Sequence, residues 1–175
     1  MKAITIFGIR SIIEAIKSGK PIDKVWLLKG VKSNLSEQLL YTLRSNNITF
    51  SYVPVERLNR FSEKNHQGAV ARIAAFQTHQ MEKIIEDISS NKKNPVFLLL
   101  DGITDTRNFG AILRSAAAID IDAVFIPTSG SAPLNGDVIK ASVGGAFKVP
   151  ISKVANLKDV VYNLCLLYTS DAADE

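Results

Sequence analysis

The sequence predicts an α/β fold built from two units that a polar connector joins. Residues 3–76 alternate short β-type runs with helical apolar faces. Residues 95–164 repeat this alternation, beginning with the uniformly apolar run Val96–Leu100, which is typical of a parallel strand covered on both faces. A length of 175 residues suits one ordinary domain or two small ones. We therefore divide the chain into residues 1–76, a connector at 77–94, a second unit at 95–164 and a tail at 165–175.

The first unit is expected to contain four strands and three helices. Four isoleucines recur at the spacing of one helical face after the first strand, and Pro54 stands at the start of the third helix. The expected strands span residues 3–6, 24–29, 48–53 and 69–74, and the expected helices begin at Ile9, Leu35 and Val55. Within the connector, an apolar stripe over residues 81–88 predicts a helix that a polar hinge at 89–94 follows.

The second unit begins as a strand–helix–strand motif. Strands are expected at residues 96–100 and 123–126, on either side of an Ala-rich helix at 111–119. A loop at 101–110 connects the first strand to this helix. Further along, we expect a loop at 128–135, a short helix at 137–141, a third strand at 149–151 and a helix from Leu157.

The tail, residues 165–175, reads as foreign to the rest of the chain. Its string CLLYTSDAADE resembles a translated sequencing adapter and contains the only cysteine. Our hypothesis is that the natural gene continues beyond Leu164 and that this chain is truncated at its C-terminus. The tail is therefore left out of the fold prediction, in which it interrupts the last helix at Leu164.

Charge is distributed unevenly along the chain, whose formal net charge is +4. Residues 1–76 hold 12 Lys and Arg against 5 Asp and Glu, residues 77–164 hold 9 of each, and the tail adds 3 acids. A surface that binds a polyanion and a merely solvated basic surface both explain the excess of +7. One cysteine allows neither a disulfide framework nor a cysteine-based zinc site, and no metal site is predicted. With no apolar run of membrane-spanning length and no signal peptide, we expect a cytoplasmic protein without membrane contact.

Residues 100–116 carry the strongest candidate for chemistry. They follow a buried strand, at the edge where open α/β sheets bind ligands, and lead into a helix N-terminus that attracts anions. Asn108 and Arg114 are the candidate functional residues; if Asn108 caps the helix, the two side chains can converge on one mouth. The alternatives are that Asn108 is only a cap and that Arg114 pairs with Asp101 or Asp105. The segment has neither a Walker loop nor a Gly-x-Gly-x-x-Gly pattern, so a dinucleotide site is not supported.

Asn108–Ala116, with the preceding Leu99–Asp105, resembles motif 1 of the SpoU/TrmH RNA 2′-O-ribose methyltransferases of the SPOUT superfamily. Lys140–Ala146, followed by Val149 and Pro150, is similar to the family's next block, whose usual form is Lys-x-Ser-x-Gly-Ala; this chain has two consecutive glycines there. Residues 3–76 resemble the family's substrate-binding domain, in particular Phe7–Ala15 and Asn65–Gly68. The best match is to the subgroup that methylates a guanosine of large-subunit rRNA.

The resemblance implies a small N-terminal α/β RNA-binding domain followed by a partial SPOUT-type parallel α/β domain that lacks the C-terminal trefoil knot. It implies rRNA as substrate, S-adenosylmethionine as cofactor, and a homodimer formed through the methyltransferase domain with both subunits at the active site. The family's later motifs would follow Leu164. We therefore expect no cofactor-binding residues in this chain, and we expect the chain as it stands to be inactive.

The resemblance also implies roles for individual residues. Arg114 matches the catalytic arginine; since arginine stays protonated, we expect it to clamp the target phosphate, with Asn108 positioning Arg114 or the ribose. The expected RNA-contacting residues are Arg10, Lys29, His66, Gln67, Arg72 and Arg107. A lone histidine such as His66 is more often structural than a ligand, and the resemblance places His66–Gly68 in a turn before the last strand of the first unit. Two rival functions stay open: a non-catalytic RNA-binding adapter based on residues 1–76, and a small-molecule enzyme that uses the loop at 101–110.

Overall fold

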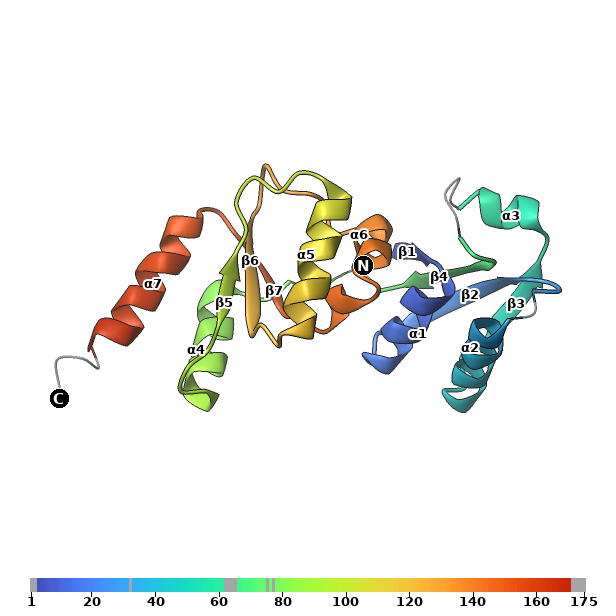
Figure 1. The fold of residues 1–175 in the computed structure, drawn as a ribbon, viewed down its shortest axis with the longest axis horizontal. Helices are drawn as coiled ribbons and strands as arrows, with labels where there is room; N and C mark the ends of the chain where they lie inside the picture. The colour runs from blue at the N-terminus through green and yellow to red at the C-terminus, as the bar shows by residue number, and fades with distance from the viewer. Residues whose placement is uncertain (1–2, 32, 62–65, 75, 77, 171–175) are drawn as a thin grey trace.

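Two β-sheets, each flanked by helices, make up the protein (Figure 1). The structure, a computed structural model, describes residues 3–31, 33–61, 66–74, 76 and 78–170. Strand order is β1-β4-β2-β3 in the first sheet and β5-β6-β7 in the second, which is parallel throughout. The predicted α/β class is confirmed. Asn65 and residues 171–175, which the sequence analysis used, lie outside the described residues.

The first unit has the seven predicted elements. These are β1 (Ile4–Phe7), α1 (Ile9–Lys17), β2 (Ile22–Leu28), α2 (Asn34–Ser45), β3 (Phe50–Val53), α3 (Val55–Asn59) and β4 (Ala69–Ile73). β2 is parallel to β3, and β4 is antiparallel to both β1 and β2. The carboxyl ends of β1, β2 and β3 therefore lie at the same edge of the sheet as the amino end of β4. We call this the front edge.

Local signals explain why these elements form. The four isoleucines of α1 are all buried, so its apolar face packs into the core as predicted. α2 begins at a reciprocal capping box between Ser33 and Ser36, in which each side chain accepts a hydrogen bond from the other residue's backbone N–H. α3 is only five residues long.

The second unit starts with α4, which lies in the predicted connector. Its elements are α4 (Met81–Asn91), β5 (Phe97–Leu99), α5 (Thr106–Ala118), β6 (Ala123–Pro127), α6 (Gly136–Ala141), the 3-10 helix η1 (Gly145–Phe147), β7 (Ile151–Val154) and α7 (Leu157–Ser170). Ile84 and Ile85 of α4 are buried in a cluster with Phe125, Val154 and Val160. α4 therefore packs on the second sheet and on α7.

Several boundaries in the second unit differ from the prediction. α4 extends to Asn91, three residues into the predicted hinge, and β5 is shorter than the predicted strand at 96–100. Three larger differences have a clear physical reason. α5 begins at Thr106, five residues early, because Asp105 caps it. β7 starts at Ile151, after Pro150, which has no N–H to donate to a neighbouring strand. α7 continues to Ser170, so the expected interruption at Leu164 is wrong; cysteine and leucine are both tolerated inside a helix.

The two units share one continuous hydrophobic core. α6 packs against β1, where a Cβ on Gly136 would lie 2.2 Å from the carbonyl oxygen of Thr5. Phe76 stacks on Phe147 of η1 with ring centroids 5.4 Å apart. The first unit is thus packed directly on the second unit. None of the described helices is long and apolar enough to cross a membrane.

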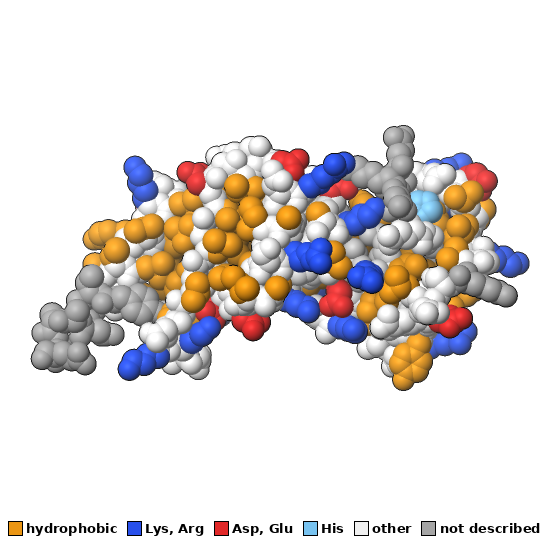
Figure 2. All heavy atoms as spheres, viewed as in Figure 1, with side chains coloured by type: hydrophobic (Ala, Val, Ile, Leu, Met, Phe, Trp, Pro, Cys, Tyr) orange, Lys and Arg blue, Asp and Glu red, His pale blue; other side chains and the backbone are white. Residues whose placement is uncertain are grey.

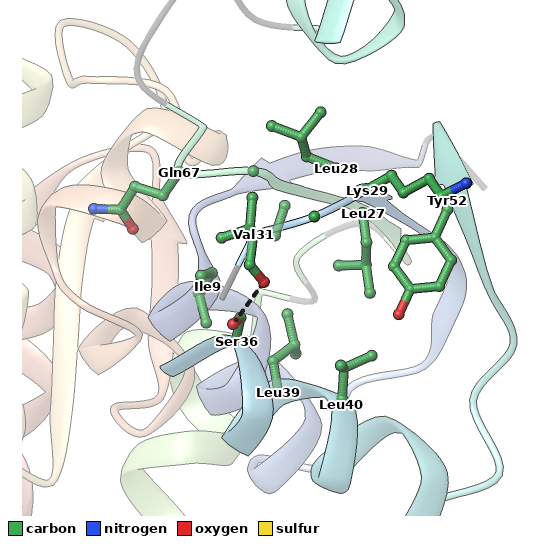
Figure 3. Close-up of a pocket in the computed structure, with 13 residues that line it drawn as sticks. Ile9, Leu27, Leu28, Lys29, Val31, Ser36, Leu39, Leu40, Tyr52 and Gln67 are labelled. Carbon is green, nitrogen blue, oxygen red and sulfur yellow. Dashed lines mark hydrogen bonds between the residues drawn. The ribbon is translucent and has the colours of Figure 1, made fainter. Parts of the chain in front are cut away.

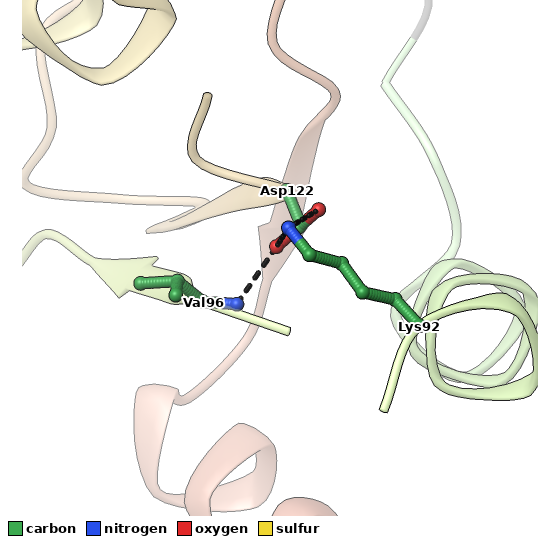
Figure 4. A network of polar contacts seen from close by, with 3 residues as sticks. All are labelled: Lys92, Val96 and Asp122. Carbon is green, nitrogen blue, oxygen red and sulfur yellow. Dashed lines mark hydrogen bonds and ion pairs between the residues drawn. The ribbon is translucent and has the colours of Figure 1, made fainter. Parts of the chain in front are cut away.

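A carboxylate fastens the start of the second sheet (Figure 4). Asp122, just before β6, accepts hydrogen bonds from the Lys92 ammonium at 2.8 and 2.9 Å and from the Val96 backbone N–H at 2.8 Å. Partial burial raises the pKa of the Asp122 carboxyl, but these hydrogen bonds lower it more, so its pKa lies below the ordinary value. The ionised form is therefore the one that stabilises the fold.

Replacing Asp122 by asparagine is expected to lower the free energy of unfolding by about 1–2 kcal/mol at pH 7. A carboxyl with a lowered folded-state pKa stabilises above its unfolded pKa of about 3.9, and this stability is lost as the pH falls through the folded pKa. The difference between wild type and Asp122→Asn, measured by urea unfolding, should therefore shrink between pH 5 and pH 2. Asp120→Asn, at an exposed position nearby, serves as the control. A difference that is the same at every pH would contradict this assignment.

Candidate functional site

The N-terminus of α5 is built by Asp105. Its carboxylate accepts the backbone N–H groups of Arg107 at 3.0 Å and of Asn108 at 2.8 Å. Asn108 is therefore a residue of the first helical turn, and the alternative that it caps the helix is wrong. The Asp-Thr pair at 105–106 is an ordinary helix-start signal that the sequence analysis passed over.

Arg114 and Asn108 point in different directions from α5. Six helical residues turn through about 600°, so the two side chains leave the helix about 120° apart and about 9 Å apart along its axis. The two side chains were predicted to approach one ligand site only if Asn108 capped the helix. Because Asp105 is the cap, they do not approach each other within one chain. Arg107 and Arg114, seven residues apart, instead share one face, and both are exposed.

Arg114 forms no ion pair with Asp101 or Asp105, all three of which are described. Asp105 is committed to the helix start instead. The alternative in which Arg114 merely pairs with one of these carboxylates is therefore wrong. Its guanidinium is available to a ligand.

Glycines allow the helix that carries Arg114 to lie close to the Lys140–Ala146 block. A Cβ on Gly110 would lie 2.3 Å from the Cβ of Ala141, and one on Gly145 would lie 3.0 Å from the Cα of Arg114. Ser142, only 1% exposed, donates to the Ile139 carbonyl at 2.9 Å and accepts from the Ala146 N–H at 3.2 Å. The block thus holds the backbone of α5 in place, and its serine is a structural residue.

The same block reaches the first unit through Gly144. This residue has φ +83°, and a Cβ on it would lie 2.3 Å from the Cβ of Glu14 in α1. Glu14 also pairs with Lys148 at 3.7 Å and with Lys17 at 3.9 Å. Two consecutive glycines therefore lie between α1 of the first unit and the backbone of Arg114. The preceding residue, Val143, has φ +51°, a strained conformation for a β-branched side chain.

Four of the expected RNA-contacting residues lie at the front edge. Arg10 lies in the first turn of α1, Lys29 follows β2, and His66 and Gln67 precede β4. His66 Nδ1 accepts the Gly68 N–H at 3.0 Å, so its Nε2 carries the proton that it donates to Asn59 Oδ1 at 3.0 Å. The predicted turn is confirmed, with Gln67 at φ +52° and Gly68 at φ +77°. Both ring nitrogens of His66 form hydrogen bonds that stabilise this turn.

Arg72 does not join this group. It lies near the opposite end of β4, paired in register with Thr5 and Lys24, and its guanidinium forms an ion pair with Asp23. The structure thus separates Arg72 from the other expected RNA-contacting residues. Sequence alone could not show this, because it depends on the antiparallel direction of β4.

Cations from both units gather over the middle of the molecule, where α5 and α1 lie (Figure 2). Arg10, Lys17 and Lys148 are exposed around the junction, and Arg107 and Arg114 are exposed on α5. The sequence analysis assigned the excess charge to residues 1–76, but neither Lys17 nor Lys148 was among the expected RNA-contacting residues. Lys148 becomes part of this surface only through the packing of η1 near α1, for which the sequence carries no local signal.

Comparison with known proteins gives two family matches that cover both units. Residues 5–79 match the family of RNA 2′-O ribose methyltransferase substrate-binding domains, and residues 95–169 match the SpoU rRNA methylase family. The second match overlaps the first five residues of the tail.

Curated relatives match nearly the whole chain. A protein of Bacillus subtilis assigned to the TrmH family of tRNA/rRNA methyltransferases is 30% identical over 152 residues, 87% of this chain. One of Staphylococcus haemolyticus with the same assignment is 32% identical over 164 residues, 94% of this chain. The chain spans 61% and 66%, respectively, of the lengths of these relatives.

Solved structures share the fold. The SpoU methyltransferase AviRb from Streptomyces viridochromogenes, in complex with AdoMet, has a TM-score of 0.71 at 19% identity, covering 96% of this chain and 60% of AviRb. An RNA 2′-O ribose methyltransferase has a TM-score of 0.70 at 20% identity, covering 95% of this chain and 60% of that protein. With a substrate-binding match on the first unit and a methylase match on the second, the chain belongs to the SpoU/TrmH family of RNA methyltransferases.

Proposed function

We propose that the whole protein methylates a ribose 2′-hydroxyl of RNA, with a guanosine of large-subunit rRNA as the target. The observation that carries the proposal is the shared arginine face of α5 beside the RNA-binding unit. Arg107 and Arg114 project from one side of a helix whose backbone is two glycines away from α1, the helix of Arg10. A polyanionic strand held by the first unit can therefore reach Arg114.

Arg114 has the chemistry that the proposed reaction needs from the protein. Its planar guanidinium can bind a phosphate through two parallel hydrogen bonds and stabilise charge that develops on a ribose oxygen. Arg107, seven residues earlier on the same face of α5, is proposed to bind the neighbouring phosphate. Asn108 lies too far around the helix to position Arg114, so its proposed partner is the ribose.

S-adenosylmethionine is the proposed cofactor, because it is bound in the AviRb structure and supplies a methyl group already activated on a sulfonium centre. At the carboxyl edge of the second sheet, the Ser131 hydroxyl is buried without a hydrogen-bond partner among the described residues. One hydroxyl does not make a nucleoside site, so we assign no cofactor contact to this chain. We propose that sequence beyond Leu164 supplies that site, that residues 165–175 are not native, and that the chain as it stands is inactive.

The proposed working form is a cytoplasmic homodimer that associates through the methylase unit. In this proposal, residues 1–76 bind RNA and residues 95–164 form the first part of the catalytic domain. A non-catalytic RNA-binding adapter is the second candidate, because Arg10 and Lys29 lie at an edge built by the first unit alone. Transfer of a labelled methyl group to rRNA by the protein with the complete methylase domain separates the two.

The 175-residue chain is expected to bind structured RNA with an affinity that falls steeply as salt increases. Each phosphate contact releases counterions, so the slope of log Kd against log salt counts the contacts. Arg10→Ala and Lys29→Ala should each reduce that slope by about one. Fluorescence anisotropy of a labelled rRNA hairpin between 50 and 300 mM salt measures it.

Arg72→Ala is the matched control, since Arg72 lies at the other end of β4 in an ion pair with Asp23. Its slope should equal that of the wild type. Binding that is independent of salt, or an Arg72→Ala variant as weak as Arg10→Ala, would count against the proposed RNA surface.

A further inference from the structure

A cavity of about 330 Å³ opens at the front edge of the first sheet (Figure 3). It lies between the end of β2, the first turns of α2, and Tyr52 of β3. Lys29 and Gln67, both expected from sequence to contact RNA, belong to its lining. The cavity is therefore part of the same edge as the proposed RNA contacts, and no function described so far uses it.

The interior of the cavity is apolar. Leu39 and Leu40 point from α2 toward Leu27 and the ring of Tyr52 in Figure 3. Leu27 and Leu39 are buried, whereas Tyr52 remains 52% exposed on an edge strand. A volume of this size reaches the lower end of the range for small-molecule pockets. The cavity thus offers a flat apolar guest one aromatic face that solvent can reach.

The rim of the cavity suits a charged backbone attached to such a guest. The Lys29 side chain is exposed and extends toward Tyr52. Gly30, at φ +87°, leaves open space beside it, because a Cβ there would have no atom within 4 Å. A phosphate can therefore approach the backbone at this point, next to a cation. The net charge of +7 on residues 1–76 favours a polyanionic ligand over a neutral one.

We propose that this cavity receives an unpaired nucleobase of the bound RNA, stacked on Tyr52, while Lys29 contacts the adjoining phosphate. The inference rests on the proposed function, since it assumes that the first unit binds RNA. Bases that are splayed out of loops and stacked on aromatic side chains are the usual way in which proteins recognise single-stranded RNA. The site would select a looped strand over a duplex.

The wall of the cavity indicates weak discrimination among the four bases. The Ser36 hydroxyl accepts the Ser33 N–H at 2.9 Å, and its single proton faces the carbonyls of Ser33 at 2.8 Å and Val31 at 3.1 Å. It is therefore committed to the capping box of α2. Gln67 extends its amide away from the other lining side chains in Figure 3. Recognition would then depend on stacking, which every base offers.

The test compares two RNAs with the 175-residue chain. One is a fluorescent hairpin with an eight-nucleotide loop containing all four bases; the other has the same stem and phosphates but an abasic loop. Wild type should bind the base-containing loop more tightly. Tyr52→Ala should weaken binding of that loop about five- to thirtyfold, the loss of one stacked base, and should leave binding of the abasic loop unchanged. Such a cycle isolates the contact between ring and base.

Two further variants guard against indirect effects. Tyr52→Phe keeps the ring and should bind like wild type, and Leu40→Trp should fill the cavity and weaken only the base-containing loop. Tyr41→Ala is the matched control: Tyr41 is on α2, 75% exposed and outside the lining, and its loss should change neither affinity. Thermal melts confirm that each variant is folded.

The outcomes distinguish the inference from the function on which it rests. If wild type binds both RNAs equally well, or Tyr52→Ala weakens both equally, the base site is wrong while RNA binding stands. If wild type binds neither RNA at 50 mM salt, the proposed RNA-binding function fails and the base site fails with it.

Discussion

Replacing Arg114 by alanine in the protein with the complete methylase domain is expected to slow methyl transfer by about 10²–10³, the usual effect of losing one preorganised donor. The fold should be unaffected, because Arg114 is exposed and forms no ion pair with Asp101 or Asp105. Arg114→Lys should recover little, since an ammonium cannot reproduce the guanidinium fork. Single-turnover methylation and thermal melts on one preparation measure both properties.

Arg107→Ala and Arg44→Ala are the companion variants. Arg107 shares the face of Arg114 and is proposed to bind phosphate, so its loss should raise KM more than it lowers kcat. Arg44 is exposed in the last turn of α2, and Arg44→Ala should change neither KM nor kcat. A folded Arg114→Ala enzyme with near wild-type turnover would end the catalytic assignment.

Replacing Gly144 by alanine is expected to lower the free energy of unfolding by about 2–5 kcal/mol. A Cβ there would lie 2.3 Å from the Cβ of Glu14 and 2.8 Å from its Cγ, so α1 and η1 must move apart, an overpacking that costs about 1–3 kcal/mol. A left-handed φ of +83° adds about 1–2 kcal/mol for a residue with a side chain. Urea unfolding measures the sum.

Gly130→Ala separates the two contributions. Gly130 has a similar φ of +74°, but a Cβ there would have no atom within 4 Å. Gly130→Ala should therefore show the backbone cost alone. If the two variants lose the same stability, the first unit does not pack on the Gly144–Gly145 pair as the structure has it.

Local sequence patterns predicted the elements well, because each depends on residues close together in the chain. The isoleucine stripe of α1 and the apolar run that contains β5 are signals of this kind. The start of α5 lies five residues before the predicted one, because the prediction assigned all of residues 101–110 to a loop. Asp105, an ordinary N-cap residue, begins the helix within that range. The helix α7 was predicted to end at Leu164 because residues 165–175 were regarded as foreign to the chain. Helix propensity depends on the residues themselves, and those of the tail up to Ser170 continue the helix.

Grouping of the candidate residues was predicted less well, because it depends on tertiary structure. Arg10, Lys29 and His66 come together since β1, β2 and β3 run in one direction and β4 runs against them. The same reversal carries Arg72 away to pair with Asp23. Neither strand direction nor the contact of Gly144 with α1 is encoded in a short pattern. The arginine face of α5, in contrast, follows from a seven-residue spacing as soon as the helix start is known.

Nucleoside mass spectrometry of rRNA from the source organism, with and without the intact gene, tests the proposed function most directly. It does not depend on the proposal that the native sequence continues beyond Leu164. The proposal predicts that deletion removes a 2′-O-methylated guanosine from large-subunit rRNA. A gene copy that encodes Arg114 should restore the modification, and a copy with Arg114→Ala should not. An unchanged set of ribose methylations in the deletion strain, with tRNA measured in parallel, would contradict it.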